Sequence, residues 1–160
     1  MLAVVKTERK KGAVAVLDVS NPEVSERDVL IRTEACGVCG SDLHAYNYDP
    51  GYEFICIPVI FGHEYCGTVI DAGSAVSGFK AGDRVVVESG SYCGACRHCQ
   101  EGNTNLCEKF QVFGLARDGG MAQFSSVDEQ FVHHLDERVD AVSGALVEPA
   151  TVAIHAVADH

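Results

Sequence analysis

Basic residues are scarce in this sequence. Lys and Arg together make up 12 of its 160 residues, against 23 Asp and Glu, and the formal net charge is -11. Proteins that bind nucleic acid normally present a basic surface, and acidic lipids likewise attract basic segments. We therefore expect no DNA, RNA or membrane partner.

Long apolar runs are also missing. A membrane-spanning helix needs about 20 consecutive apolar residues, and no segment approaches that length. The N-terminal stretch 1–11 places its charges after a very short apolar run, which is the reverse of a secretory signal. These two absences predict a cytoplasmic protein.

A third absence concerns the spacing of glycine. The chain has 16 glycines, but no two of them flank a single residue, so the dinucleotide-binding pattern G-x-G-x-x-G is missing. The phosphate-binding pattern G-x-x-x-x-G-K-[ST] is missing too. The sequence therefore predicts no Rossmann domain, and its 160 residues can form the core of one ordinary domain over residues 1–160.

Cysteine, in contrast, is abundant, and half of the eight cysteines crowd into one segment. Cys93, Cys96, Cys99 and Cys107 have the spacing of a site in which four thiolates bind one structural zinc ion. Such a site has no open coordination position, so any chemistry must lie elsewhere. The alternatives are packed thiols or an iron-sulfur cluster, although the usual cluster motif has a shorter last gap followed by proline, where this chain has Glu108.

A second group of residues offers different ligand types. Cys39, His44, the pair His63-Glu64 and Glu148 supply thiolate, imidazole and carboxylate groups. This is the mixed donor set of a catalytic zinc site with one open position. We therefore expect two zinc ions per chain, one structural and one catalytic.

Cys36 and Cys39 also form a C-x-x-C pair, which can bind metal or carry out thiol redox chemistry. For Cys36 we favour simple packing, because free cysteine behaves as a small buried apolar residue. A thiol redox protein is a rival hypothesis, and it requires a reactive thiol of low pKa without bound metal.

Short apolar runs separated by turn residues dominate the chain, which is typical of a mainly β protein with a few helices (α+β). The lobe that holds the four cysteines interrupts the strands over about 91–109, and Pro149 is expected to open a final helix over 149–160. No glycine caps the end of that helix, and no segment of the sequence is left to cover its apolar residues. We therefore expect that the chain ends before its fold is complete, and that it can form a homo-oligomer. The predicted strands are 12–19, 28–33, 66–70, 84–87, 121–127 and 130–135.

Several motifs in a fixed order resemble the zinc-dependent medium-chain dehydrogenase/reductase family. The resemblance runs from Asp28 to His155. It implies a GroES-like domain, a partly open β-barrel that carries a structural zinc lobe and leads toward a Rossmann domain absent from this chain. The motifs are Gly37-Val-Cys39-Gly-Ser41-Asp42-Leu-His44, Gly62-His63-Glu64, Gly78-Phe-Lys-Ala-Gly82-Asp83-Arg84-Val-Val and the four-cysteine lobe.

The resemblance also implies roles for individual residues. Cys39 and His63 would be ligands of the catalytic zinc, and Glu64 or Glu148 would supply a carboxylate. Adjacent side chains of a regular strand point to opposite faces, so His63 and Glu64 can reach one metal only if the backbone there is irregular.

The implied reaction is oxidation of a secondary alcohol by NAD or NADP. Zinc would act as a Lewis acid that promotes loss of the alcohol proton, and hydride would pass to the nicotinamide. Ser41 would take the proton, and His44 would pass it to solvent through the cofactor ribose. The cofactor would bind outside this chain, so we expect the isolated catalytic domain to be inactive alone.

The resemblance does not decide the substrate. Glu148 resembles the polyol and sorbitol dehydrogenase branch, whereas the segment from His44 to Asp49 looks more like the threonine dehydrogenase branch. A small sorbitol-, butanediol- or threonine-like alcohol is the expected substrate. The rival from another class is a non-catalytic, zinc-stabilised binding or scaffold module.

Overall fold

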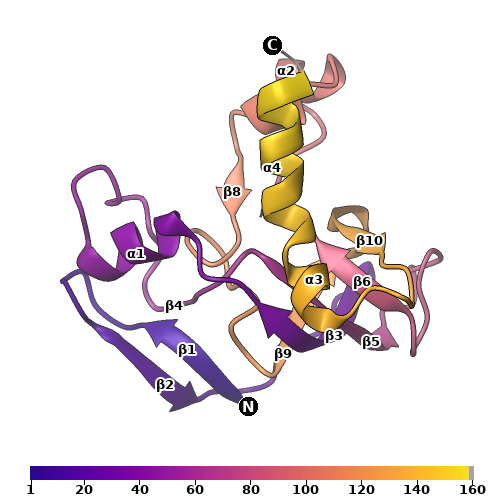
Figure 1. Ribbon diagram of the computed structural model, residues 1–160, viewed down its shortest axis with the longest axis horizontal. Helices are drawn as coiled ribbons and strands as arrows, with labels where there is room; N and C mark the ends of the chain where they lie inside the picture. Colours follow the sequence, from indigo (N-terminus) through magenta and orange to yellow (C-terminus); the bar gives the residue numbers. More distant parts are fainter. Residues whose placement is uncertain (159–160) are drawn as a thin grey trace.

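The computed structural model describes residues 1–158, so the last two residues of the predicted helix 149–160 lie outside the described part (Figure 1). The N-terminal sheet has three strands in the antiparallel order β2-β1-β4. Its strands are β1 (Leu2–Lys6), β2 (Val14–Asp18) and β4 (Val59–Ile60).

The main sheet has five antiparallel strands in the order β10-β6-β5-β3-β9. Side chains alternate between its two faces, so Val29 and Ile31 of β3 are both fully buried and pack with Val69 of β5 in the largest core cluster. This sheet therefore forms the rigid frame next to which the predicted ligands lie. The strands are β3 (Asp28–Cys36), β5 (Tyr65–Ala72), β6 (Arg84–Val87), β9 (Phe124–Asp128) and β10 (Val132–His134).

A two-stranded ribbon of β7 (Gly90–Ser91) and β8 (Gln111–Val112) carries the cysteine lobe. The lobe contains α2 (Arg97–Gln100) and a 3-10 helix (Thr104–Leu106). The ribbon brings the two ends of the lobe together, which explains how 91–109 can interrupt the strands without disturbing the main sheet.

The change of composition after Val139 also predicts that the helices cluster at the C-terminus. That prediction is wrong, because α1 (Gly40–Asn47) directly follows the loop after β3. Near the C-terminus, α3 (Ala141–Ala145) precedes α4 (Val147–Ala158), which projects from the sheets in Figure 1. The side chains of 151–158 are exposed, including Ile154 at 64% and Val157 at 81%. Within residues 1–158, no helix is long and apolar enough to cross a membrane.

The fold class is the predicted one: mostly strands in open sheets, with no closed barrel among residues 1–158. Of the six predicted strands, only 84–87 has the predicted bounds; the other five differ by one to three residues at one or both ends, and β1 was not predicted. The segment 130–135 begins with a 3-10 turn (Glu129–Phe131) before β10, and α4 begins at Val147, so Pro149 is its third residue. A proline in the first turn is tolerated because its missing N–H has no partner within the helix.

A buried lysine connects the N-terminal sheet to α1. Lys6 is fully buried at the end of β1, and its ammonium donates to the carbonyl of Lys10 at 2.6 Å and to that of Tyr46 at 3.1 Å. The backbone N–H of Gly12 donates to the Tyr46 carbonyl as well, at 2.9 Å. A positive charge at the C-terminal end of a helix is favourable, so Lys6 holds this end of α1 in place.

A buried hydrogen bond joins the two strands that flank β3. The hydroxyl of Tyr65 on β5 lies 2.8 Å from Oγ of Ser125 on β9, and both residues are buried. Burial raises the pKa of Tyr65, so the phenol is neutral at physiological pH.

We predict that Tyr65→Phe lowers the free energy of unfolding by about 1–2 kcal/mol, because Ser125 loses its buried partner. Zinc-saturated protein unfolded in urea would provide the measurement. Tyr46→Phe, at a tyrosine 43% exposed, is the matched control and should change stability by less than about 0.5 kcal/mol. Equal effects of the two substitutions would contradict this role for Tyr65.

Candidate metal centres

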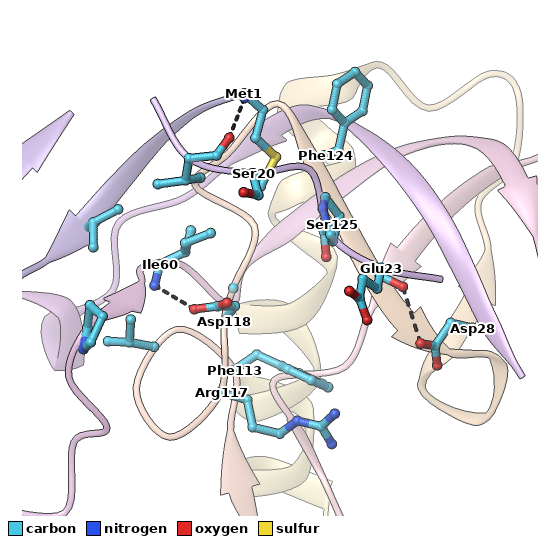
Figure 2. Close-up of a pocket in the computed structure, with 17 residues that line it drawn as sticks. Met1, Ser20, Glu23, Asp28, Ile60, Phe113, Arg117, Asp118, Phe124 and Ser125 are labelled. Carbon is cyan, nitrogen blue, oxygen red and sulfur yellow. Dashed lines mark hydrogen bonds between the residues drawn. The ribbon is translucent and has the colours of Figure 1, made fainter. Parts of the chain in front are cut away.

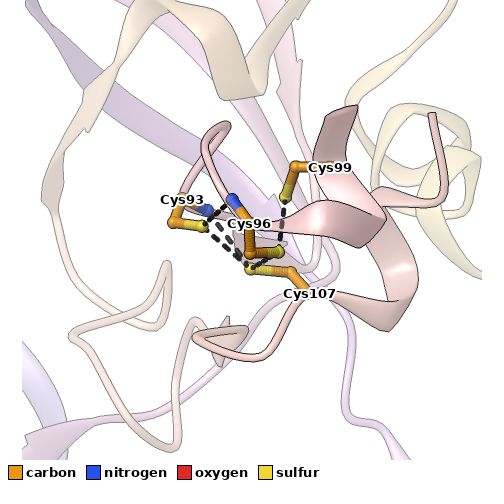
Figure 3. A group of neighbouring side chains, drawn as sticks. All are labelled: Cys93, Cys96, Cys99 and Cys107. Carbon is orange, nitrogen blue, oxygen red and sulfur yellow. Dashed lines mark hydrogen bonds between the residues drawn. The ribbon is translucent and has the colours of Figure 1, made fainter. Parts of the chain in front are cut away.

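The four cysteines of the lobe converge on one point (Figure 3). The Sγ atoms of Cys93 and Cys107 are 3.6 Å apart, and Sγ of Cys96 lies 3.6 Å from that of Cys99 and 4.0 Å from that of Cys107. A tetrahedron with zinc–sulfur bonds of about 2.3 Å has sulfur–sulfur edges of about 3.8 Å. The cage thus has the size that zinc requires, and four sulfurs leave no open position.

Backbone N–H groups surround these sulfurs. The N–H of Cys93 and that of Lys109 each donate to Sγ of Cys107 at 3.3 Å, and the N–H of Cys96 donates to Sγ of Cys93 at 3.3 Å. Hydrogen bonds from the backbone of Ala95 and Cys96 lower the pKa of Cys93 to about 6. The backbone therefore favours the thiolate of Cys93, the form that binds metal, whereas desolvation raises the pKa of Cys99 to about 12.

A second cluster lies where two separate segments meet, the loop before α1 and the bend before β5. One ligand atom each from Cys39, His63 and Glu64 lies within 4.8 Å of the others. Cys39 is the residue before α1, while His63 and Glu64 precede β5 in a bend outside the strand. The backbone at His63 and Glu64 is irregular, as two adjacent ligands of one metal require, so both side chains reach one site.

Glycine makes this close approach possible. Gly62 has φ +93°, and a Cβ there would lie 2.5 Å from Sγ of Cys36. A Cβ on Gly37 would lie 2.3 Å from Oε2 of Glu64. Side chains at these two positions would push apart the segments that bring the ligands together.

The ring of His63 faces two residues of α1. Its Nε2 lies 3.4 Å from Oγ of Ser41, and its Nδ1 lies 4.0 Å from Oδ1 of Asp42. Nδ1 of His63 and Oδ1 of Asp42 are both buried and lack a hydrogen-bond partner. A metal bound at Nε2 would leave Nδ1 to donate to this carboxylate, as metal-binding histidines commonly do, so the residues fit the expected zinc ion.

From the sequence, Ser41 and Asp42 are also candidates to cap a short helix, and the sequence assigns Asp42 no other role. The structure shows that role, since Oδ2 accepts the N–H of Cys39 at 2.9 Å, and it also places the second oxygen toward His63. Burial raises the pKa of Asp42. Its position three residues after a cysteine ligand was the signal that could have identified it.

Glu148 lies beside this cluster but outside the group within 4.8 Å. It is buried in the first turn of α4, and burial raises its pKa, while a hydrogen bond from Ser89 and the nearby His63 act in the opposite direction. Glu148 lines a cavity of about 470 Å³ together with Val87, Ser89, Leu135 and Thr151. Of the two predicted carboxylates, Glu64 is therefore the one nearer to Cys39 and His63.

Cys36 behaves as a packed thiol. It is half-buried, donates to the carbonyl of Gly37 at 3.5 Å and packs against the main core cluster. Burial, followed by the charges of Asp42 and Glu64, raises its pKa to about 12. A thiol redox role would need the opposite shift, so the geometry favours packing.

A separate cavity of about 620 Å³ lies between the N-terminal sheet and the main sheet (Figure 2). Its lining includes Met1, Ile60, Phe113 and Arg117, but none of the predicted ligands. The cavity is thus remote from the chemistry expected of this chain.

Comparison with known proteins agrees with this geometry. Residues 25–137 match the alcohol dehydrogenase GroES-like domain. This chain belongs to that family. Its predicted membership in the zinc-dependent medium-chain dehydrogenases is therefore confirmed.

Three similar proteins illustrate the relationship. A sorbitol dehydrogenase from Halalkalibacterium halodurans is 38% identical over 99% of this chain, and an L-threonine 3-dehydrogenase from a Shewanella species is 34% identical over 97%. A Sinorhizobium meliloti protein described as a zinc-binding dehydrogenase, solved with NADP bound, has a TM-score of 0.91 and 36% identity over 98% of this chain. The chain spans 46% of each of the first two relatives and 44% of the third.

We predict that Asp42→Ala weakens zinc binding at the GroES-like domain's Cys39–His63–Glu64 site about 10- to 100-fold, because His63 loses the carboxylate that orients it. Chelator competition measures this affinity, and the zinc of the four-cysteine lobe should be unaffected. The control is Asp71→Ala on the exposed end of β5. Unchanged affinity in the Asp42 variant would show that its carboxylate does not support the ligand.

Proposed function

We propose that this chain is the zinc-binding catalytic domain of an NAD(P)-dependent alcohol or polyol dehydrogenase. The convergence of Cys39, His63 and Glu64, with Ser41 Oγ only 3.4 Å from His63 Nε2, carries the proposal. A closed four-sulfur cage cannot bind substrate, whereas this three-ligand set leaves a position for one oxygen of a small molecule.

When bound there, zinc supplies a Lewis acid that favours the ionised form of an alcohol. Ser41 lies at the site, and its Oγ can accept the hydroxyl proton while giving up its own hydrogen to the next group of the relay. His44 follows three residues later on α1, so it lies on the same side of the helix, and its exposed ring can pass the proton onward. Buried Asp42 faces Nδ1 of His63 and would hold the ring in orientation once a metal occupies Nε2.

The nicotinamide cofactor and the substrate belong to the proposal for the whole protein. NADP in a similar structure and the names of the two dehydrogenase relatives support an NAD(P)-dependent reaction of a sorbitol-, butanediol- or threonine-like alcohol. Residues 1–160 lack a dinucleotide-binding pattern, so we expect the cofactor to bind another domain and this chain to be inactive alone. We expect the enzyme to act in the cytoplasm.

The proposal predicts two zinc ions per chain, bound independently. Cys39→Ala should remove one ion and leave the other, while Cys99→Ala should remove the ion of the lobe. Elemental analysis of freshly purified protein counts the ions, and cobalt replacement identifies each site, because four thiolates and a single thiolate give different absorption.

Cys56→Ala is the matched control, since this exposed cysteine belongs to neither cluster and its loss should leave both ions in place. One tightly held metal in the wild-type chain would contradict the proposal. That result would favour the zinc-stabilised scaffold module, which needs only the four-cysteine site.

A further inference from the structure

The turn after α1 brings a carboxylate back onto the imidazole of His44. Tyr48 ends the helix with φ 54° and ψ 51°, and it is the one non-glycine residue with positive φ within residues 1–158. In this left-handed turn the N–H of Tyr48 donates to the carbonyl of Ala45, and the N–H of Asp49 donates to that of His44. Asp49 therefore lies beside His44 although five residues separate them.

Two contacts define the position of the ring. Nδ1 of His44 lies 2.8 Å from Oδ2 of Asp49. The ring of Tyr52 stacks on the imidazole, with centroids 5.3 Å apart and an interplanar angle of 28°. The N–H of Tyr52 donates to the carbonyl of Asp49 at 3.1 Å, so one short loop supplies both contacts.

Hydrogen bonds anchor the end of α1 that leads into this loop. The carbonyl of Tyr46, one turn from Asp49, accepts from buried Lys6 and from the N–H of Gly12. These bonds fix the C-terminal end of α1 against the N-terminal sheet. The contact between His44 and Asp49 thus rests on an anchored element, although both side chains are partly exposed.

The chemistry of the two groups determines where the proton resides. An ionised carboxylate only accepts hydrogen bonds, so Nδ1 of His44 must donate. In neutral imidazole the other nitrogen then has no hydrogen and is an acceptor. Asp49 therefore selects Nε2 as the atom that can receive a proton.

We propose that Asp49 is a positioning residue that holds His44 in the Nδ1–H tautomer, while Tyr52 fixes the plane of the ring. The role of Nε2 in the proton relay rests on the proposed dehydrogenase function. The tautomer itself does not, so the two can fail separately.

Long-range hydrogen–nitrogen NMR of the zinc-loaded chain tests the tautomer in alkaline solution, where imidazole is neutral. We expect Nδ1–H in the wild type. Asp49→Asn keeps an acceptor oxygen and should retain Nδ1–H, whereas Asp49→Ala should shift the population to Nε2–H, which free imidazole side chains favour. Nε2–H in the wild type, or an unchanged spectrum in Asp49→Ala, would overturn the proposal.

Glu53→Gln is the matched control, because Glu53 lies in the same loop but accepts from the N–H of Gly51 and should leave the His44 signals unchanged. A control that moved His44 as far as Asp49→Ala does would show a general effect of the loop and contradict the specific role of Asp49. Zinc content, measured on the same samples, tests the proposed function separately. A wild-type chain that binds no ion at Cys39, His63 and Glu64 would refute that function, whereas the tautomer of His44 would be unchanged.

Discussion

The candidate active centre depends on the close approach of two backbone segments, the loop before α1 and the bend before β5. Gly37 and Gly62 form this contact, and neither position has room for a Cβ. Because the bend departs from strand geometry, two adjacent side chains turn toward the same metal site. The rigid main sheet supplies β3 and β5 on either side of the contact and so fixes its spacing.

Electrostatics then distinguishes the two metal centres. In the lobe, backbone N–H groups point at the sulfurs of Cys93 and Cys107 and favour their thiolate forms, which suits a permanent ion. At the second centre, buried Asp42 and Glu64 surround His63 in a poorly solvated site, where an uncompensated negative charge is costly. A divalent cation would offset that charge, so the arrangement of acids agrees with metal binding.

Much of this could be read from the sequence, because short-range spacing determines it. The interval between Cys93 and Cys107 predicts a cage, and the structure brings those sulfurs to tetrahedral distances. The contact between Cys39 and His63 is long-range: their ligand types suggested one site, and the resemblance to a known family assigned both residues to it. Asp42 and Asp49 were not assigned roles beside the histidines: spacing places Asp42 close to a ligand, but it does not show which nitrogen of a histidine each carboxylate faces.

The helix positions show a related limit. Composition and the proline predicted the final helix. For α1 the sequence indicated only that Ser41 and Asp42 could cap a short helix, because this segment lacks an apolar period. Tertiary contacts from Lys6 and Gly12 stabilise it instead. Local propensity alone would not have located the element that carries Ser41 and His44.

The ribbon of β7 and β8 has a wider consequence for the architecture. Its strands pair Gly90 with Val112 and Ser91 with Gln111, so the chain leaves the body and returns at nearly the same place. Everything between is an insertion that the ribbon closes, and its four cysteine sulfurs could share one ion of their own. Evolution could therefore shorten, replace or delete this module by rejoining the ribbon, while the sheet and the second centre keep their connectivity.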